Sequence, residues 1–346
     1  MDVLISVVTG FYNRGSFVKS SIGSLLNQTY QNIEVIVFDD NSTDNTYEEL
    51  LKIKDKRLRV IRHSINVGFV TGLINAIKQS SGEYIAIHGS GDISRPERLQ
   101  KQYEVLSSSD EIGVVGCNVL NFDRVSDGRM INTERKCKAD RKSKADLIDG
   151  GNCFTHGEVM MKRKYYDMVG GYRRAFYYTQ DRDLWLRLMD VCKFGVVDEI
   201  LYERIYIPNS LRFNLEKVII QKKYSELARQ CAELKDNGRE DLVDMYGIHA
   251  IGFLKKSKRL SSFYYKLFLD YLYENSNISL KCLKLAIDEY FCLSSFISYY
   301  LIKLLGFNKF ANLFKVILSL NKSIIQLKNK FLPLLIKNPI TSKQIN

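Results

Sequence analysis

Short runs of apolar residues alternate with amphipathic stretches along the N-terminal part of this chain. Residues 3–8, 33–38, 58–61 and 84–87 are rich in β-branched side chains and lie between turn formers. Runs of this kind are typical of strands that are buried on both faces of a sheet. Because helical patterns separate the runs, the sequence predicts βαβ units and an α/β domain with a mostly parallel central sheet.

Two of the intervening segments carry helix signals. Val18, Ile22 and Leu25 fall on one helical face, as the spacing of an amphipathic helix requires. Thr46 and Glu49 have the spacing of a capping box, which predicts that a helix begins at Thr46. Residues 121–144 are polar and basic and predict a loop or hairpin, with plain solvated surface as the alternative.

The chain changes character in its C-terminal part. Residues 1–199 carry 28 basic and 27 acidic side chains, whereas residues 200–346 hold +11 of the total formal charge of +12. We therefore predict one domain over residues 1–205 and a basic, mostly helical region over residues 206–346. Its aromatic and lysine-rich helices either rest on an anionic membrane surface or pack as an ordinary helical subdomain.

Composition narrows the cellular setting. Apolar residues make up 45% of the chain and charged residues 26%, as in folded soluble proteins. No signal-peptide pattern opens the sequence, and the uncharged stretch Tyr290–Ile302 is too short to span a bilayer. Seven cysteines without paired spacing favour reduced thiols over disulfides or a zinc site. We expect a cytoplasmic protein, placed peripherally on the inner face of the cell membrane if the basic helices bind lipid.

Asp39 and Asp40 follow directly after the second predicted strand. Open α/β sheets bind ligands beyond the carboxyl ends of their strands, so this pair of carboxylates is a candidate ligand site. The alternative is that both residues only shape the turn that continues through residues 41–46.

Several short motifs occur in a fixed order within residues 3–205. They are Ser6-Val7-Val8-Thr9, Tyr12-Asn13-Arg14, Gln28-Thr29-Tyr30, Glu34-Val35-Ile36-Val37, Asp39-Asp40-Asn41-Ser42-Thr43-Asp44 and Gly82-Glu83-Tyr84-Ile85-Ala86. In order and spacing this set resembles the family 2 glycosyltransferases. The resemblance implies a Rossmann-like GT-A fold and an inverting transfer from a nucleotide sugar. A UDP-sugar is the expected donor, and a glycan or lipid-linked glycan of cell-surface polysaccharide synthesis is the expected acceptor.

The resemblance also implies a nucleotide site. Asp39 and Asp40 would lie against the nucleoside, where a carboxylate accepts a hydrogen bond from a uracil N–H or a ribose hydroxyl. Thr9 and Tyr12 would line the same pocket. The family often has an arginine at the position of Ile74, so one expected phosphate contact has no candidate here.

The family's metal-binding motif departs from its usual form. Its two aspartates correspond to Gly89 and Gly91, and only Asp92 remains. The resemblance makes Asp92 a donor-binding residue and the candidate ligand for Mg²⁺ or Mn²⁺, which would stabilise the departing nucleoside diphosphate. The alternative is that Asp92 sits in a plain turn and caps the helix that includes residues 96–106.

A second block resembles the acceptor half of the family. It comprises residues 154–163, Val169-Gly170-Gly171-Tyr172-Arg173 and Gln180-Asp181-Arg182-Asp183-Leu184-Trp185-Leu186-Arg187-Leu188. Asp181 matches the catalytic base, which takes the proton of the acceptor hydroxyl; an N-cap is its alternative. His156 and Arg187 are acceptor or phosphate candidates. His156 can instead be structural, and Arg187 can instead pair with Asp183 one helical turn away.

Two other functions stay open from the sequence. A catalytically silent protein that binds nucleotide or sugar fits the glycines at 89 and 91 and Gln180 in place of an acid. A nucleotidyltransferase would share the nucleotide-binding architecture. The net charge alone would suit nucleic acid, but no recognised motif supports such a partner, so we expect none.

Overall fold

The computed structural model describes residues 3–124, 130–205 and 215–316. The chain divides into two compact units, Met1–Leu254 and Lys255–Asn346. The first unit thus continues past residue 205, the predicted end of the catalytic domain, through the long helix α8 (Leu215–Asp236).

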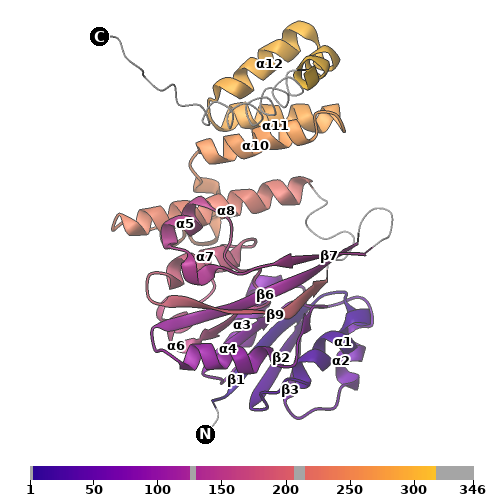
Figure 1. The fold of residues 1–346 in the computed structure, drawn as a ribbon, viewed down its shortest axis with the longest axis vertical. Helices are drawn as coiled ribbons and strands as arrows, with labels where there is room; N and C mark the ends of the chain where they lie inside the picture. The colour runs from indigo at the N-terminus through magenta and orange to yellow at the C-terminus, as the bar shows by residue number, and fades with distance from the viewer. Residues whose placement is uncertain (1–2, 125–129, 206–214, 317–346) are drawn as a thin grey trace, which may run out of the picture. The chain divides into compact units, whose positions relative to one another are not determined.

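A single mixed sheet forms the centre of the first unit (Figure 1). Its strands run in the order β3-β2-β1-β4-β8-β6-β9-β5, and β7 pairs with β6 outside this path. The strands are β1 (Ile5–Phe11), β2 (Ile33–Asp39), β3 (Leu58–Arg62), β4 (Tyr84–His88), β5 (Ile93–Ser94), β6 (Ile112–Arg124), β7 (Met130–Arg135), β8 (Met160–Lys162) and β9 (Lys193–Ile205).

The predicted parallel sheet is confirmed for the first four strands. β1 pairs in parallel with β2 and β4, and β2 pairs in parallel with β3. Beyond β4 the sheet becomes mixed, because β8 runs antiparallel to both β4 and β6 while β9 is parallel to β6. β6 and β7 form a hairpin within residues 121–144, as predicted, although residues 125–129 at its turn lie outside the described residues.

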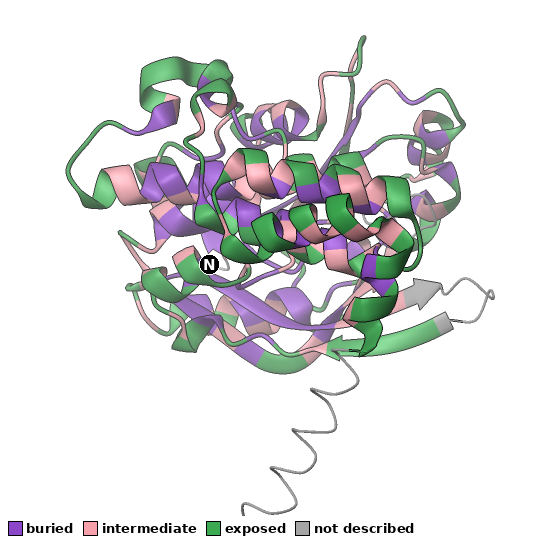
Figure 2. Ribbon diagram, turned by 90° about the horizontal axis from the view of Figure 1, so that it is seen from above, coloured by how far each residue is buried: buried purple, intermediate pink, exposed green. Residues whose placement is uncertain are grey.

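Alternate side chains of the strands enter two separate cores. Val7, Val35 and Val37 face the helices α1 (Gly15–Leu26), α2 (Thr46–Lys52) and α4 (Arg98–Ser107). Val8 and Ile36 face the opposite side, which α3 (Phe69–Lys78), α6 (Arg163–Met168), α7 (Gln180–Leu188) and α8 cover. This period of two explains why both faces of β1, β2 and β4 are apolar and buried, and Figure 2 shows purple strands in the interior.

The predicted helix over Val18, Ile22 and Leu25 is confirmed, and all three residues are fully buried. The capping box predicted at the start of α2 is wrong. The N-cap is Asn45, and Asp44 accepts the backbone N–H of Thr46 at 2.9 Å and also its hydroxyl hydrogen bond. A carboxylate two residues before Thr46 reaches these donors more easily than Glu49 can.

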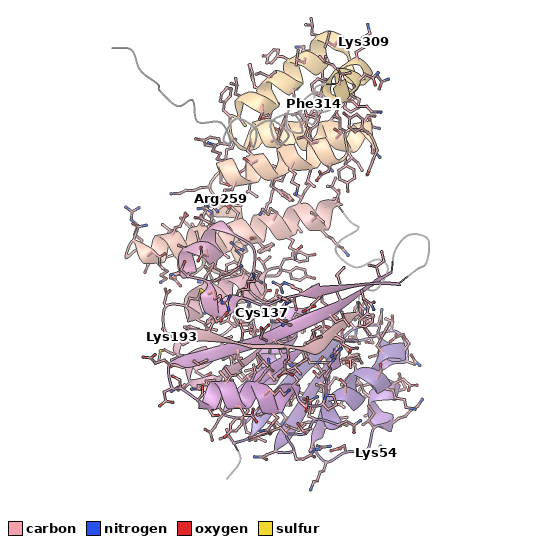
Figure 3. The ribbon with its side chains drawn as sticks, in the orientation of Figure 1. Lys54, Cys137, Lys193, Arg259, Lys309 and Phe314 are labelled. Atoms are coloured by element: carbon pink, nitrogen blue, oxygen red, sulfur yellow. The ribbon has the colours of Figure 1, made fainter. Side chains whose placement is uncertain are left out.

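The helices of the first unit that have not yet been named are short. They are α5 (Lys144–Asp149) and α9 (Leu242–Tyr246), with the 3₁₀ turns η1 (Ala139–Arg141) and η3 (Gly247–Phe253). Lys54 and Lys193 lie on the outside of this unit, whereas Cys137 lies within it (Figure 3).

The second unit is helical, as predicted. It consists of α10 (Lys258–Asp270), α11 (Ser276–Glu289), α12 (Leu293–Leu305) and the helical residues 307–316. Its core comprises Leu260, Tyr264, Phe268, Leu272, Cys282, Leu283, Ala286, Phe310 and Ala311. Arg259 and Lys309 are exposed (Figure 3). Within the described residues, no helix is long and apolar enough to cross a bilayer.

Candidate active site

The predicted nucleotide residues lie where three parallel strands end. Thr9 of β1 is in register with Val37 of β2 and with His88 of β4. The loops that follow these strands therefore leave the sheet at one edge, as parallel strands require. Hydrogen bonds join the loops: Asp40 donates its backbone N–H to the Phe11 carbonyl at 2.9 Å, and Asn13 donates to the Ser42 hydroxyl at 3.0 Å.

Thr9 and Tyr12 differ in how accessible they are. Thr9 is fully buried, and its hydroxyl has no hydrogen-bond partner among the described residues. Tyr12 is 48% exposed, so its ring is available to stack on a flat ligand. Both residues stay candidates for the nucleoside site.

Asp39 and Asp40 are buried and already bonded within the chain. Asp39 accepts from the hydroxyl of Ser42, and the guanidinium of Arg62 lies 3.8 Å from its carboxylate. One oxygen of Asp40 contacts the ring of His63 at 2.9 Å, and its other oxygen accepts the backbone N–H of Gly68 at 2.9 Å. These contacts match the turn alternative for Asp39. Through Asp40 they also fix the loop before α3, and a carboxylate has enough lone pairs to accept one further donor.

Asp92 lies after β4 and turns toward β9. Its two oxygens accept from the Tyr202 hydroxyl at 2.7 Å and from the Ile205 backbone N–H at 3.0 Å. Tyr202 in turn accepts the backbone N–H of Gly89 at 2.8 Å. Burial raises the pKa of Asp92, although these hydrogen bonds oppose the rise. The helix α4 has Glu97 as its N-cap, so Asp92 does not cap it.

The residues present do not fit the family's usual carboxylate-held metal. A Cβ at Gly89 would lie 2.2 Å from a carboxylate oxygen of Asp92, so no acidic side chain can stand there without moving Asp92. Gly91 has a φ of +98°, a conformation that an L side chain adopts only with strain. The described residues contain no group of three or more histidine, cysteine, aspartate or glutamate side chains placed to hold a metal.

Asp181 lies in the first turn of α7 and is half-buried. Its carboxylate accepts from the side-chain amide of Asn152 and from the backbone N–H of Arg182 at 2.8 Å. The N-cap of α7 is Thr179, which takes the left-handed conformation at φ +56°. The N-cap alternative for Asp181 is therefore wrong; one carboxylate oxygen bonds the Arg182 backbone and the other bonds Asn152.

His156 contacts one residue of the predicted acceptor block and one residue beside the loop that Asp40 holds. Its Nε2 lies 2.7 Å from the Tyr172 hydroxyl, and its ring packs edge-on against Phe69, with centroids 6.0 Å apart. Burial lowers the pKa of His156, while the negative charge of Asp181 acts against this shift. His156 therefore has a structural partner and also lies within electrostatic reach of the proposed base.

A chain of contacts links the Asp40 and Asp92 regions. Phe69, which packs on His156, follows Gly68, the residue that donates to Asp40. A Cβ at Gly157 would lie 2.2 Å from the Tyr202 hydroxyl, the group that bonds Asp92. His156 and Gly157 thus connect the loops of Asp40 and Asp92, and the charge of Asp181 acts on His156.

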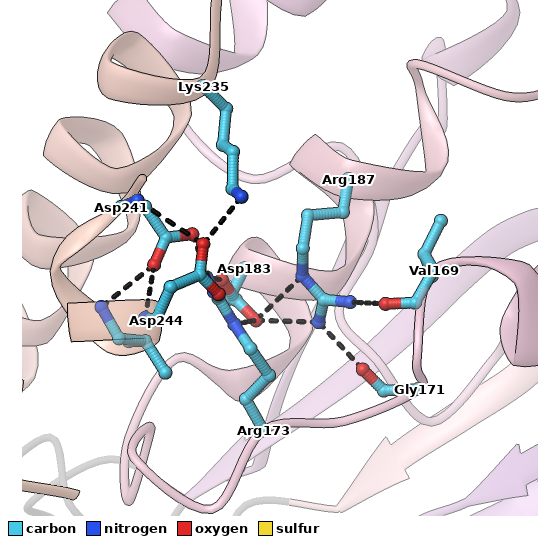
Figure 4. A network of polar contacts seen from close by, with 9 residues as sticks. Val169, Gly171, Arg173, Asp183, Arg187, Lys235, Asp241 and Asp244 are labelled. Carbon is cyan, nitrogen blue, oxygen red and sulfur yellow. Dashed lines mark hydrogen bonds and ion pairs between the residues drawn. The ribbon is translucent and has the colours of Figure 1, made fainter. Parts of the chain in front are cut away.

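Arg187 belongs to a buried ionic network behind α7 (Figure 4). Its guanidinium pairs with Asp183 at 2.7 Å and donates to the Val169 and Gly171 carbonyls at 2.6 and 2.7 Å. Arg173 bridges Asp183 to Asp241 near the start of α9. Of the two roles considered for Arg187, the pair with Asp183 is the one observed, and the network fixes the helix that carries Asp181. Leu184, Trp185 and Leu188 are fully buried and pack this helix, as predicted.

Sequence patterns gave no reason to select Tyr202, Asn152 or Arg98. Arg98 is fully buried, donates to Ser94, Gln102 and backbone carbonyls, and stacks over the Tyr202 ring at 5.0 Å. An arginine buried without a carboxylate hydrogen bond is unusual, but it stands in an ordinary helical pattern that shows nothing of this contact.

Known proteins resemble this chain in sequence. Residues 6–170 match the family described as Glycosyl transferase family 2. MJ1057 of Methanocaldococcus jannaschii, named an uncharacterized glycosyltransferase, is 30% identical over 227 residues, which are 64% of this chain and 77% of MJ1057. EpsE of Bacillus subtilis is 32% identical over 54% of this chain. WfgD of Escherichia coli, named a UDP-Glc:alpha-D-GlcNAc-diphosphoundecaprenol beta-1,3-glucosyltransferase, is 25% identical over 71% of this chain and 90% of WfgD.

The lengths of the matches differ. The alignments span 66% of EpsE and 36% of a Haemophilus influenzae glycosyltransferase, so this chain matches less than two thirds of either protein. Among solved structures, TarS residues 1–349 of S. aureus with UDP-GlcNAc superpose with a TM-score of 0.53 at 15% identity, covering 83% of this chain and 89% of TarS. A mannosyltransferase of Pyrobaculum calidifontis gives a TM-score of 0.50 at 15% identity, covering 89% and 83% of the two chains. These likenesses confirm the GT-A-like fold.

Proposed function

Because the chain belongs to the family 2 glycosyltransferases, we propose that it transfers a sugar from a nucleotide donor to a glycan or lipid-linked glycan. The expected donor is a UDP-sugar, and the expected setting is cell-surface polysaccharide synthesis. The name of WfgD specifies a UDP-sugar donor and a lipid diphosphate acceptor, and it supports a donor and an acceptor of these kinds here.

The observation that supports the proposal is that His156 and Gly157 link the loops of Asp40 and Asp92, while the charge of Asp181 acts on His156. Tyr12, with its exposed ring, would stack on the nucleoside base; the Thr9 hydroxyl would donate or accept a hydrogen bond beside it, and the Asp40 carboxylate would accept one. Asp39, which is bonded to Ser42, would support this loop.

Asp181 would act as the base of an inverting transfer. The acceptor oxygen forms a bond to the anomeric carbon, the bond from that carbon to the phosphate oxygen breaks, and its electron pair leaves on the diphosphate. The acceptor proton passes to the Asp181 carboxylate. Asn152 orients this carboxylate through its amide, and the network of Arg187 and Asp183 holds the helix in place.

The experiment measures release of nucleoside diphosphate from a panel of UDP- and GDP-sugars, with a lipid diphosphate glycan as acceptor. Asp181→Asn should lower turnover by about 10²–10⁴-fold, the usual contribution of a general base, while nucleotide binding is retained. Asp190→Asn, an exposed position just after the same helix, is the control. Full turnover in Asp181→Asn would remove this residue as the base.

The glycines at 89 and 91 keep a silent binding protein as the second candidate. In the same assay such a protein binds nucleotide but releases no diphosphate, whereas a nucleotidyltransferase produces pyrophosphate. The basic helices of the second unit would place the enzyme peripherally at a membrane that holds a lipid-linked acceptor. Flotation with anionic liposomes tests this, and absence of binding at low salt would leave these helices a packing role.

A further inference from the structure

The one carboxylate left in the metal-binding motif is committed to the protein. Both oxygens of Asp92 already accept hydrogen bonds, from Tyr202 and Ile205, and the residue is only 9% exposed. An acid at position 89 would require the Asp92 carboxylate to move, because a Cβ there would lie 2.2 Å from one of its oxygens. Asp92 would offer a cation only a buried carboxylate that is already bonded within the protein, so the leaving diphosphate would need positive charge from a further source.

Arg14 lies on one side of the turn that contains Gly91 and Asp92 and is one candidate for this positive charge. It directly precedes α1, and the first turns of that helix pack against the turn at Gly91: Gly91 donates its N–H to the Ser21 hydroxyl at 3.3 Å. A Cβ at Gly91 would meet the ring of Phe17 at 3.4 Å. Burial lowers the pKa of Arg14, and the charge of Asp92 opposes this shift.

Arg204 stands on the other side. It lies two residues after Tyr202 in β9, and side chains two apart in a strand point to the same face. Tyr202 reaches Asp92 and Gly89 from that face, and the next residue, Ile205, gives its N–H to Asp92. The positive charge of Arg204 also acts on the Asp92 carboxyl to lower its pKa.

We propose that Arg14 and Arg204 bind the diphosphate of the donor and stabilise it as it leaves, so that nucleotide binding needs no divalent cation. Two guanidinium groups carry about the charge of one divalent ion, and each presents a planar pair of donors that matches phosphate oxygens. When the bond from the anomeric carbon to the phosphate oxygen breaks, the electron pair stays on the diphosphate and both arginines remain protonated. This inference rests on the proposed function for the identity of the ligand and supplies the phosphate contact that Ile74 cannot make.

Calorimetric titration of the full chain with UDP and with GDP, in EDTA and in Mg²⁺ or Mn²⁺, tests the inference. The better-bound nucleotide should have the same Kd within about twofold in all buffers, and Arg14→Gln and Arg204→Gln should each weaken it by about tenfold or more. Lys54→Gln is the matched control, because it removes one positive charge from an exposed side chain beyond the end of α2. Arg14→Lys and Arg204→Lys should give intermediate values, since the charge stays and the planar pair of donors is lost.

Three results would overturn the inference: a tenfold or greater loss of affinity in EDTA, arginine variants that bind like Lys54→Gln, or no binding of either nucleotide to the wild-type chain. Thermal unfolding of each variant, followed by Trp185 fluorescence, shows whether the first unit is intact. The assay of sugar transfer tests the proposed function separately. Nucleotide binding that depends on the arginines, without any sugar transfer, would refute the transferase but not the arginine site.

Discussion

Asp183→Asn tests whether the ionic network behind α7 stabilises the first unit. Asp183 is 2% exposed and pairs with Arg173 and Arg187, so the substitution leaves two half-buried guanidinium groups without their shared carboxylate. Breaking a buried ion pair from one side costs about 3–5 kcal/mol. Arg173 keeps Asp241 and Arg187 keeps two carbonyl oxygens, so we expect the lower end, about 3 kcal/mol.

A loss of this size should lower the melting temperature by about 6–12 °C for a unit of this length. Trp185 is the only tryptophan of the chain and is fully buried in α7, so its fluorescence reports the unfolding of the first unit. Asp190→Asn breaks the exposed pair with Lys144 and should change stability by less than about 1 kcal/mol.

The pH dependence gives a second readout. Burial acts to raise the pKa of Asp183, but its pairs with Arg187 and Arg173 outweigh burial and hold this pKa below the ordinary 3.8. A depressed folded-state pKa contributes stability that is present above 3.8 and lost as the pH falls through the folded value. The difference between wild type and Asp183→Asn should therefore shrink in acid. A loss no larger than that of Asp190→Asn at pH 7 would refute the role of this network.

Three further predictions concern packing, protonation and thiol chemistry. Gly72→Ala should destabilise the first unit by about 1–3 kcal/mol in urea unfolding, because the new Cβ would lie 2.3 Å from the Phe38 ring; Gly23→Ala, with open space around it, should be neutral or slightly stabilising. Burial raises the pKa of Asp92, so the stability that this carboxyl contributes is lost as the pH rises through its folded-state pKa. The free energy of unfolding of Asp92→Asn should therefore rise relative to that of wild type between pH 4 and pH 8, and a difference that stays constant over this range would contradict this. Iodoacetamide at pH 8 should label Cys292 first, because Ser294 lowers its thiol pKa while burial raises that of the other six; mass spectrometry that finds another cysteine modified faster would contradict the ranking.

The sequence predicted the elements of the first unit better than their pairing. Buried strands such as β1 and β2 have a local signature, because every residue in them must suit an apolar setting on both faces. The placement of β9 beside β6 has no such signature, since it depends on which edge is open once the other strands have paired. The capping error at α2 has a similar origin, because Asp44 competes with Glu49 for the same donors.

The candidate site was predictable only where its residues follow a motif. Asp40, Asp92 and Asp181 could be selected by resemblance, and contacts link the loops of Asp40 and Asp92. The contacts of Tyr202 with Asp92 and of Asn152 with Asp181 join segments far apart in the chain. An ordinary tyrosine in a strand and an asparagine in a loop give no sign of such partners. The same contacts decide that Asp92 faces β9, which the motif alone could not show.

The position of β9 has a consequence for how the protein is made. Among the described residues this strand is the last one of the sheet in sequence, yet it lies between β6 and the short β5 and carries both Tyr202 and Ile205, which donate to Asp92. Until residues 193–205 have emerged from the ribosome, β6 has an unpaired edge in the nascent chain and β5 has no strand to pair with. Such an edge invites association with other chains. A polypeptide that ends before this strand should therefore need chaperone protection, and its Asp92 would lack the hydrogen bond from Tyr202.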